Sequence, residues 1–246
     1  MVYQVLIAAL LPVVILLIYI YREDKKSPEP VSQIIKAFFY GILSVFISLC
    51  ISQPLEAIGA YTSEYTTITE AISHSFFGAA IPEEIAKFTM LWLVMKKCSH
   101  FDERLDGIVY AVSVSLGFAA LENIFYIVKE SEWLGTGIFR ALTAVPGHYC
   151  NGVLMGYYYS KVRLSHFSTF KDRAMILVAP VITHGIYDSI FLSGEAIGNI
   201  NIILLVFLPL LIYFIYKLHK YCLKRINETV EQDKLDIALR DGGKEE

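Results

Sequence analysis

About seven runs of apolar residues, each near the ~20 residues that a helix needs to cross a bilayer, divide the sequence. They cover roughly residues 2–21, 34–53, 72–95, 106–128, 138–160, 174–193 and 199–219. Hydrophobic residues make up 55% of the 246 residues, and the mean hydropathy is +0.52. This pattern excludes an ordinary soluble domain and predicts an all-α, polytopic helix bundle in a membrane.

The distribution of basic residues predicts the orientation of this bundle. Alternate connections carry most of the bases: Arg22, Lys25 and Lys26; Lys96, Lys97 and Arg104; Lys161, Arg163, Lys171 and Arg173; and the residues from Lys217 onward. Because such connections stay in the cytoplasm, we expect the N-terminus outside and the C-terminus inside. The bundle would comprise residues 1–221, followed by a charged cytoplasmic tail at 222–246, and the segment 54–71 could form a lid.

Ionisable side chains lie inside four consecutive runs. They are Glu83, Glu84 and Lys87 in the third run, Glu122 in the fourth, His148 in the fifth, and His184 and Asp188 in the sixth. A charge at the bilayer centre costs about 2.5–3.5 kcal/mol on insertion scales, so these groups must meet one another or water. Prolines lie close to three of these sites, at Pro82, Pro146 and Pro180, where they would kink the helices.

Helical spacing predicts which of these groups share a face. His184 and Asp188 are four residues apart, as are Glu83 and Lys87, so the members of each pair lie on one side of their helix. Glu83 and Glu84 differ by about 100° around the helix axis, so we expect one of them to face a shared centre. Counting along the helices places all the groups near the midplane or in the outer half, within reach of one cavity.

Imidazoles and carboxylates together favour a divalent metal, of which zinc is the usual one with these ligands. We assign Glu122, His148 and His184 as ligands, with Asp188 either as a fourth ligand or as a residue that hydrogen-bonds to one of the ligands. Glu83 or Glu84 would accept the proton of an attacking water, and Lys87 would hold its neighbour. Without a metal, a buried glutamate could act as the base and a histidine could donate to an oxyanion. Both mechanisms would hydrolyse a peptide bond inside the membrane.

Other functions are compatible with the same residues. Buried acids and histidines on kinked helices also suit a cation or proton transporter, although no inverted repeat is visible. A membrane binding protein without chemistry is a third possibility. The net charge of −3 is small and gives no information about nucleic-acid binding, and we expect no nucleic-acid partner. Arg140 is expected to reach the outer surface or to meet a substrate, and Asn151 to hold helices together.

Three short motifs occur in order on successive runs. Glu83–Lys87 matches EExxK, Phe118–Glu122 matches FxxxE, and His184–Asp188 matches HxxxD. With the stretches around them, from about residue 71 to 193, they resemble the PrsW family of bacterial intramembrane proteases, which is related to the CAAX-protease superfamily. In the CAAX-type relatives the second motif ends in His and the last in Asn, so this chain carries more carboxylate, which favours a metal.

The resemblance implies a multi-pass protein of the bacterial cytoplasmic membrane that takes part in regulated intramembrane proteolysis. Its substrate would be a membrane-bound anti-sigma factor, cut first on the extracytoplasmic side. The resemblance also implies that Glu83 and Glu84 are the family's essential glutamate pair and that His184 is its late histidine.

Overall fold

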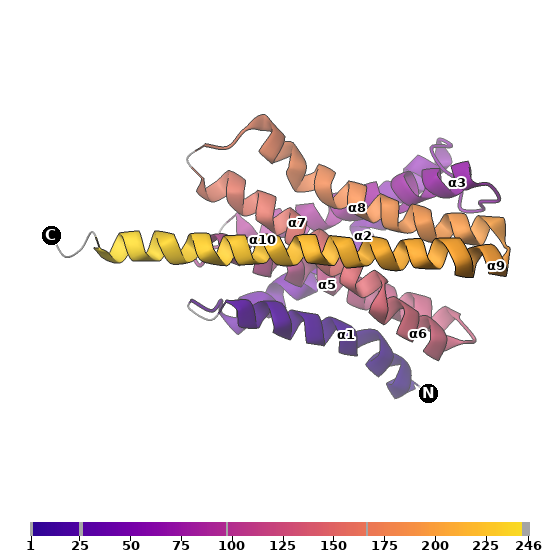
Figure 1. The fold of residues 1–246 in the computed structure, drawn as a ribbon, viewed down its shortest axis with the longest axis horizontal. Coiled ribbons are helices and arrows are strands. Elements are labelled where there is room, and N and C mark those ends of the chain that lie inside the picture. Colours follow the sequence, from indigo (N-terminus) through magenta and orange to yellow (C-terminus); the bar gives the residue numbers. More distant parts are fainter. Residues whose placement is uncertain (1, 25–26, 97, 166, 243–246) are drawn as a thin grey trace.

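The computed structural model describes residues 2–24, 27–96, 98–165 and 167–242, and within these ranges it contains helices and no strands (Figure 1). The elements are α1 (Val2–Glu23), α2 (Val31–Ala57), α3 (Ile68–Ser73), the π-helix η1 (His74–Ala80), α4 (Ile81–Met95), α5 (Arg104–Lys129), α6 (Trp133–Leu142), α7 (Ala144–Leu164), α8 (Phe170–Ile197), α9 (Ile200–Ile202), the π-helix η2 (Ile203–Phe207) and α10 (Leu208–Gly242).

Five helices in the described residues are long and apolar enough to cross a membrane. They cover Tyr3–Glu23, Val31–Ala57, Arg104–Lys129, Phe170–Ile197 and Ile200–Leu239. The all-α membrane bundle is therefore confirmed, whereas the count of seven spans and the orientation stay predictions. The two termini lie at opposite ends of the bundle, as an odd number of passes requires (Figure 1).

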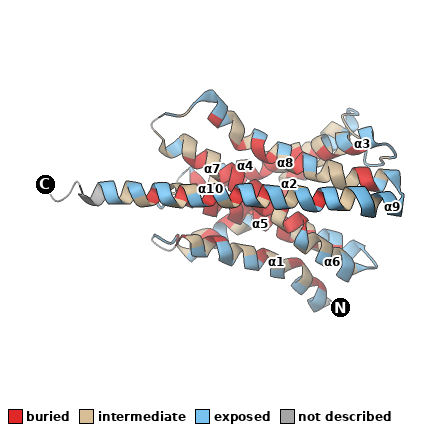
Figure 2. Cartoon of the chain, in the orientation of Figure 1, coloured by how far each residue is buried: buried red, intermediate tan, exposed pale blue. Residues whose placement is uncertain are grey.

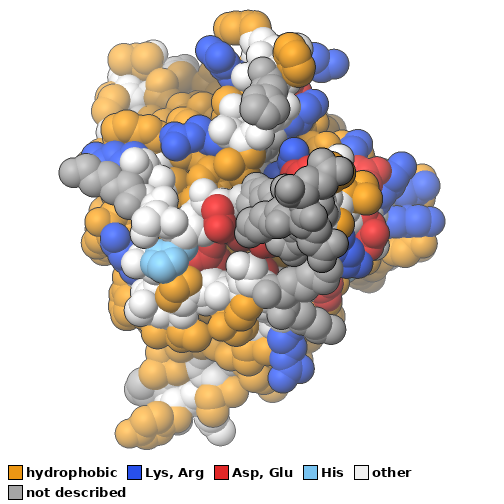
Figure 3. Space-filling model, turned by 90° about the vertical axis from the view of Figure 1, so that its left-hand side faces the viewer, with side chains coloured by type: hydrophobic (Ala, Val, Ile, Leu, Met, Phe, Trp, Pro, Cys, Tyr) orange, Lys and Arg blue, Asp and Glu red, His pale blue; other side chains and the backbone are white. Residues whose placement is uncertain are grey.

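Basic side chains surround the rim of the bundle end at which the C-terminus lies (Figure 3). This end includes the α4–α5 and α7–α8 connections, and Lys96, Arg104 and Lys161 lie in or next to them, Arg104 at the start of α5 and Lys161 in the last turn of α7. It is the end that the charge distribution assigns to the cytoplasm. Lys25, Lys26 and Lys97, which belong to the same prediction, lie outside the described residues.

Helix α5 forms the centre of the bundle, and nearly every side chain from Leu105 to Ala120 is buried (Figure 2). Small residues let α7 approach it closely. A Cβ atom added to Gly156 of α7 would lie 2.4 Å from the carbonyl oxygen of Gly107 of α5. Small residues at helix crossings allow the backbones to touch, which is the main source of packing energy between membrane helices. The α5–α7 pair is therefore the rigid frame on which the other helices rest.

Prolines set the irregular points of the bundle. The predicted run 138–160 is not one helix, because α6 ends at Leu142 and α7 starts at Ala144. A proline ring collides with the carbonyl four residues earlier, and for Pro146 that residue is Leu142. Pro82 follows the π-helical turn η1 for the same reason, since the wider turn leaves room for its ring.

The predicted charged tail is the second half of α10. The helix continues to Gly242, and one side of it packs against α5 and α7 through the buried side chains of Leu218, Cys222 and Ile226. Farther along, the carboxylate of Asp233 accepts hydrogen bonds from the first two backbone amides of α5 at 3.0 and 2.9 Å. This stretch is thus part of the fold, and residues 243–246 lie outside the described part of the chain.

Candidate active site

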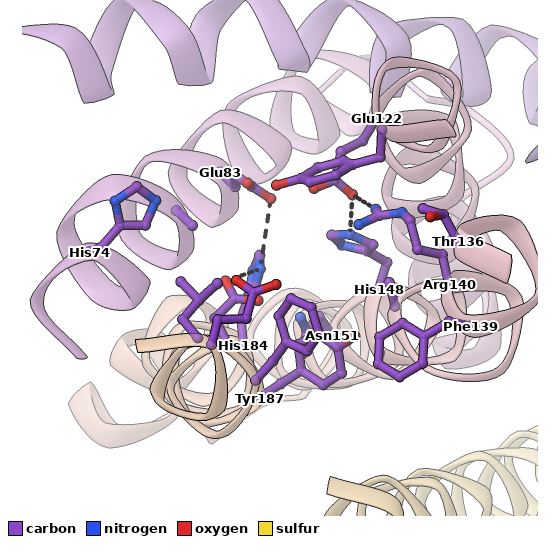
Figure 4. A pocket seen from close by; sticks show the side chains of 18 of the residues that line it. His74, Glu83, Glu122, Thr136, Phe139, Arg140, His148, Asn151, His184 and Tyr187 are labelled. Atoms are coloured by element: carbon purple, nitrogen blue, oxygen red, sulfur yellow. Dashed lines mark hydrogen bonds and ion pairs between the residues drawn. The ribbon is translucent and has the colours of Figure 1, made fainter. Parts of the chain in front are cut away.

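A cavity of about 470 Å³ lies among α4, α5, α6, α7 and α8 (Figure 4). Five of the ionisable residues singled out in the sequence line it: Glu83, Glu122, His148, His184 and Asp188. Glu84 and Lys87 are fully buried beside it and are not among the lining side chains. The structure therefore brings all seven residues to one place inside the bundle, as the helical spacing predicted.

Glu83, Glu84 and Lys87 lie in the first two turns of α4, directly after the π-helical turn. A π-turn holds one extra residue, so it rotates the residues that follow by about 100° relative to a continuous α-helix. In this register Glu83 faces the cavity and Glu84 faces the helices behind it. The carboxylate of Glu83 is 14% exposed, whereas that of Glu84 is 0% exposed.

The Lys87 ammonium holds several of the buried groups together. It lies 2.9 Å from Oε1 of Glu84, 3.4 Å from Oε2 of Glu83 and 3.0 Å from Nδ1 of His148. The same nitrogen sits 4.1 Å from the ring centre of Phe118, which adds a cation–π contact. Phe118 thus stabilises the lysine, a role that the sequence pattern did not indicate.

Each of the two imidazoles is held by a carboxylate on one nitrogen. Nε2 of His148 lies 2.8 Å from Oε2 of Glu122, and Nδ1 of His184 lies 2.8 Å from Oε1 of Glu84. A histidine that donates one ring N–H to a carboxylate presents the other nitrogen in a fixed direction, an arrangement typical of metal ligands. For these two residues the other nitrogens are Nδ1 of His148 and Nε2 of His184.

The second nitrogen of His184 faces two carboxylates. It lies 3.2 Å from Oδ2 of Asp188 and 3.8 Å from Oε2 of Glu83. The rings of His148 and His184 meet edge to face with their centres 5.3 Å apart. An imidazole in this position either donates from both nitrogens as a cation or offers Nε2 to a metal ion.

The donor set fits a divalent metal. One ligand atom from each of Glu83, His148 and His184 lies within 4.8 Å of the other two. Two imidazoles and one carboxylate form a ligand set typical of catalytic zinc. This group contains Glu83 and not Glu122, which was predicted as a ligand. Glu122 lies 2.8 Å from His148 and 2.6 Å from the guanidinium of Arg140. Which of the two glutamates binds a metal stays a prediction.

Arg140, Asn151 and Thr183 also line the cavity. Arg140 was expected either at the outer surface or in contact with a substrate, and Asn151 between helices, whereas Thr183 was not singled out in the sequence. The amide of Asn151 donates to Oε1 of Glu84 at 3.4 Å and accepts from the hydroxyl of Thr183 at 2.7 Å.

The end of the cavity next to the α2–α3 loop is bounded by Tyr65, His74 and Glu195. The Tyr65 hydroxyl donates to Glu195 at 2.7 Å, which joins the loop before α3 to the end of α8. Nδ1 of His74 lies 2.9 Å from the carbonyl oxygen of Thr62 in the same loop. The segment 54–71 therefore lies at the mouth of the cavity, and its proposed role as a lid stays a prediction.

Comparisons with known proteins identify the family of the chain. The family model described as PrsW family intramembrane metalloprotease matches residues 29–214. The chain is 35% identical to Protease PrsW of Geobacillus kaustophilus over 199 residues, covering 80% of this chain and 83% of the relative. It is 35% identical to Protease PrsW of Bacillus subtilis over 216 residues, covering 86% and 92%. No solved structure matches the chain. The chain belongs to the PrsW family of intramembrane metalloproteases and is a multi-pass protein of the bacterial cytoplasmic membrane.

Proposed function

We propose that the cavity hydrolyses a peptide bond of a membrane-embedded protein, with Glu83, His148 and His184 at its centre. The observation that carries the proposal is the convergence of these three side chains on a cavity inside a membrane bundle. Groups of this kind are costly in a membrane, which indicates that they are there for chemistry.

Glu83 and Glu84 have separate tasks in this proposal. Glu83 reaches the cavity and would contact the metal or the attacking water. Glu84 is a positioning residue, because its contacts are Lys87, His184 and Asn151. Its second oxygen, Oε2, is buried and has no hydrogen-bond partner among the described residues.

Glu83, His148 and His184 would hold a divalent metal, which supplies Lewis-acid activation of water and of the substrate carbonyl. Asp188 lines the same cavity next to His184 and would accept the proton of the water. Glu122 keeps the His148 ring in place through its Nε2 atom. Should no metal be involved, Glu83 itself would be the general base and His184 the donor to the developing oxyanion.

We further propose that the substrate is a membrane-bound anti-sigma factor and that the cut falls on the extracytoplasmic side. The resemblance in sequence motifs suggests this substrate class. The position of the cavity supports the side, because the α2–α3 loop and the end of α8, which border the cavity, lie at the bundle end opposite the end of α10 (Figure 1).

The test is cleavage in proteoliposomes that contain the purified protein and a single-span anti-sigma factor from the same bacterium. The wild type should cut it, and Glu83→Gln should lower the rate at least ~100-fold, as expected when a catalytic carboxylate is lost. Glu231→Gln, which changes an exposed carboxylate on α10, is the matched control and should cut at the wild-type rate.

Two outcomes would contradict the proposal. One is cleavage by Glu83→Gln at the wild-type rate. The other is the absence of cleavage together with an ion flux that Glu83→Gln abolishes, which would identify the cavity as the path of a transporter.

A further inference from the structure

Arg140 is a charged side chain within the bundle that the proposed reaction does not use. Its side chain is 12% exposed and lines the cavity from α6. A buried guanidinium in a membrane protein is costly and marks a functional position by default. Its contacts indicate what that function is.

Three neighbouring residues of α5 hold the guanidinium. Nη2 lies 2.6 Å from Oε2 of Glu122, and Nε lies 2.7 Å from Oδ1 of Asn123. The guanidinium carbon sits 4.1 Å from the ring centre of Tyr126. Asn123 is itself anchored, because its amide donates to the carbonyl oxygen of Ala9 at 3.3 Å. Arg140 therefore has a single orientation relative to α5.

One oxygen atom connects Arg140 to the catalytic centre. Oε2 of Glu122 accepts from Nη2 of Arg140 and lies 2.8 Å from Nε2 of His148. Since the same atom serves both partners, a change in the position of Arg140 changes the position at which the histidine is held. The guanidinium and the imidazole thus bind the same carboxylate oxygen, which fixes that oxygen between α6 and α7.

We propose that Arg140 is a positioning residue, which aims Glu122 at Nε2 of His148 and so fixes the orientation of that ring at the catalytic centre, where its Nδ1 lies 3.0 Å from Nζ of Lys87. Its role rests on the proposed peptidase function. Arg140 is not a catalytic residue, because Nε, Nη2 and the face of its guanidinium already contact Asn123, Glu122 and Tyr126 of α5. It also ties α6, which is separated from α7 by the break at Thr143, to the geometry of the active site.

The proposal is tested with Arg140→Gln, Arg140→Lys and the double variant Arg140→Gln/Glu122→Gln. Arg140→Gln should lower kcat about 10- to 100-fold and leave KM within about threefold, as is typical when a partner that orients a ligand is lost. The kcat of the double variant should be at least about threefold higher than that of Arg140→Gln. The side-chain amide introduced on α5 is uncharged and still accepts a hydrogen bond from His148. The kcat of Arg140→Lys should lie between those of Arg140→Gln and the wild type, since lysine cannot contact all three residues of α5 at once. Arg173→Gln, an exposed change on α8, is the control.

A second readout does not depend on cleavage. In protein labelled with ¹⁵N-histidine, the wild type should show a hydrogen bond between Nε2 of His148 and Glu122, and Arg140→Gln should change the ¹⁵N shift of Nε2. The affinity for added Zn²⁺ should fall about 10- to 100-fold in the same variant. If the wild type cuts no substrate, the proposed function fails while these measurements still decide the role of Arg140.

Two results would overturn the proposal. A raised KM with unchanged kcat would show that Arg140 contacts the substrate. An unchanged His148 spectrum in Arg140→Gln, with a double variant no more active than the single one, would show that the arginine only holds α6 against α5. If Arg140→Gln does not fold, Arg140→Lys gives the same comparison.

Discussion

The buried lysine of α4 allows the energetics of the site to be tested apart from its chemistry. Lys87 is 1% exposed and lies within 3.4 Å of two carboxylates, Glu83 and Glu84. Replacing it by methionine keeps the volume and leaves Glu84 buried with the weaker support of His184 and Asn151. Removing one partner of a buried ion pair costs about 3–5 kcal/mol, because the remaining charge is uncompensated.

Thermal unfolding of the detergent-purified protein measures this cost. For a chain of this size, 1 kcal/mol corresponds to about 2–4 °C, so Lys87→Met should lower the Tm by about 6–20 °C. Adding Glu84→Gln should restore most of the Tm, since a buried pair replaced by neutral groups is often no less stable. The double variant should nevertheless remain impaired in cleavage, because His148 and His184 have each lost a charged neighbour. Lys96→Met, at the exposed end of α4, is the control.

The reasoning fails if Lys87→Met melts at the wild-type temperature. It also fails if the double variant melts as low as the single one. Either result would mean that Glu84 is not a charged group held by Lys87.

Three further predictions concern the α5–α7 frame and the bundle end at which α10 ends. Gly156→Ala places a Cβ 2.4 Å from a backbone oxygen of α5 and should cost about 1–3 kcal/mol, read as a lower Tm, whereas Gly135→Ala, with open space around it, should cost nothing. Burial raises the pKa of Asp24, in the α1–α2 loop, to about 6. An acid with a raised pKa in the folded protein loses stability as the pH rises from about 4 to 6, so Asp24→Asn should melt higher than the wild type at pH 7 and equally at pH 4. Asp233→Ala removes the acceptor for the first amides of α5 and should cost about 0.5–2 kcal/mol, with faster hydrogen exchange at those amides.

The membrane bundle and the members of the site could be predicted from the sequence, because both follow from the cost of charge in lipid. An apolar run of spanning length must be a helix, and a group such as Glu122 or His184 within it must find polar partners. The i, i+4 spacing of His184 and Asp188 correctly placed them side by side, at 3.2 Å.

The role of each residue within the site depends on how each helix is rotated relative to its neighbours. The spacing of residues in the sequence does not predict this rotation. Glu83 rather than Glu84 faces the cavity because of the π-turn before Pro82, a feature that helical counting omits. Glu122 contacts Arg140 because the break before Pro146 sets α6 apart as a separate helix next to α5. Both differences arise at prolines. The sequence predicts that a proline kinks its helix, but it does not predict the direction of the kink.

The metal content of the purified protein tests the central claim most directly. We predict about one divalent metal per chain in the wild type, its loss in Glu83→Gln, and its retention in Glu122→Gln at saturating Zn²⁺, because in our proposal Glu83 would bind the metal and Glu122 would only orient His148. Loss in Glu122→Gln with retention in Glu83→Gln would contradict this ligand set and favour the one predicted from sequence. A wild type without metal that still cuts its substrate in chelator would contradict the metal site altogether and leave Glu83 as a metal-free base.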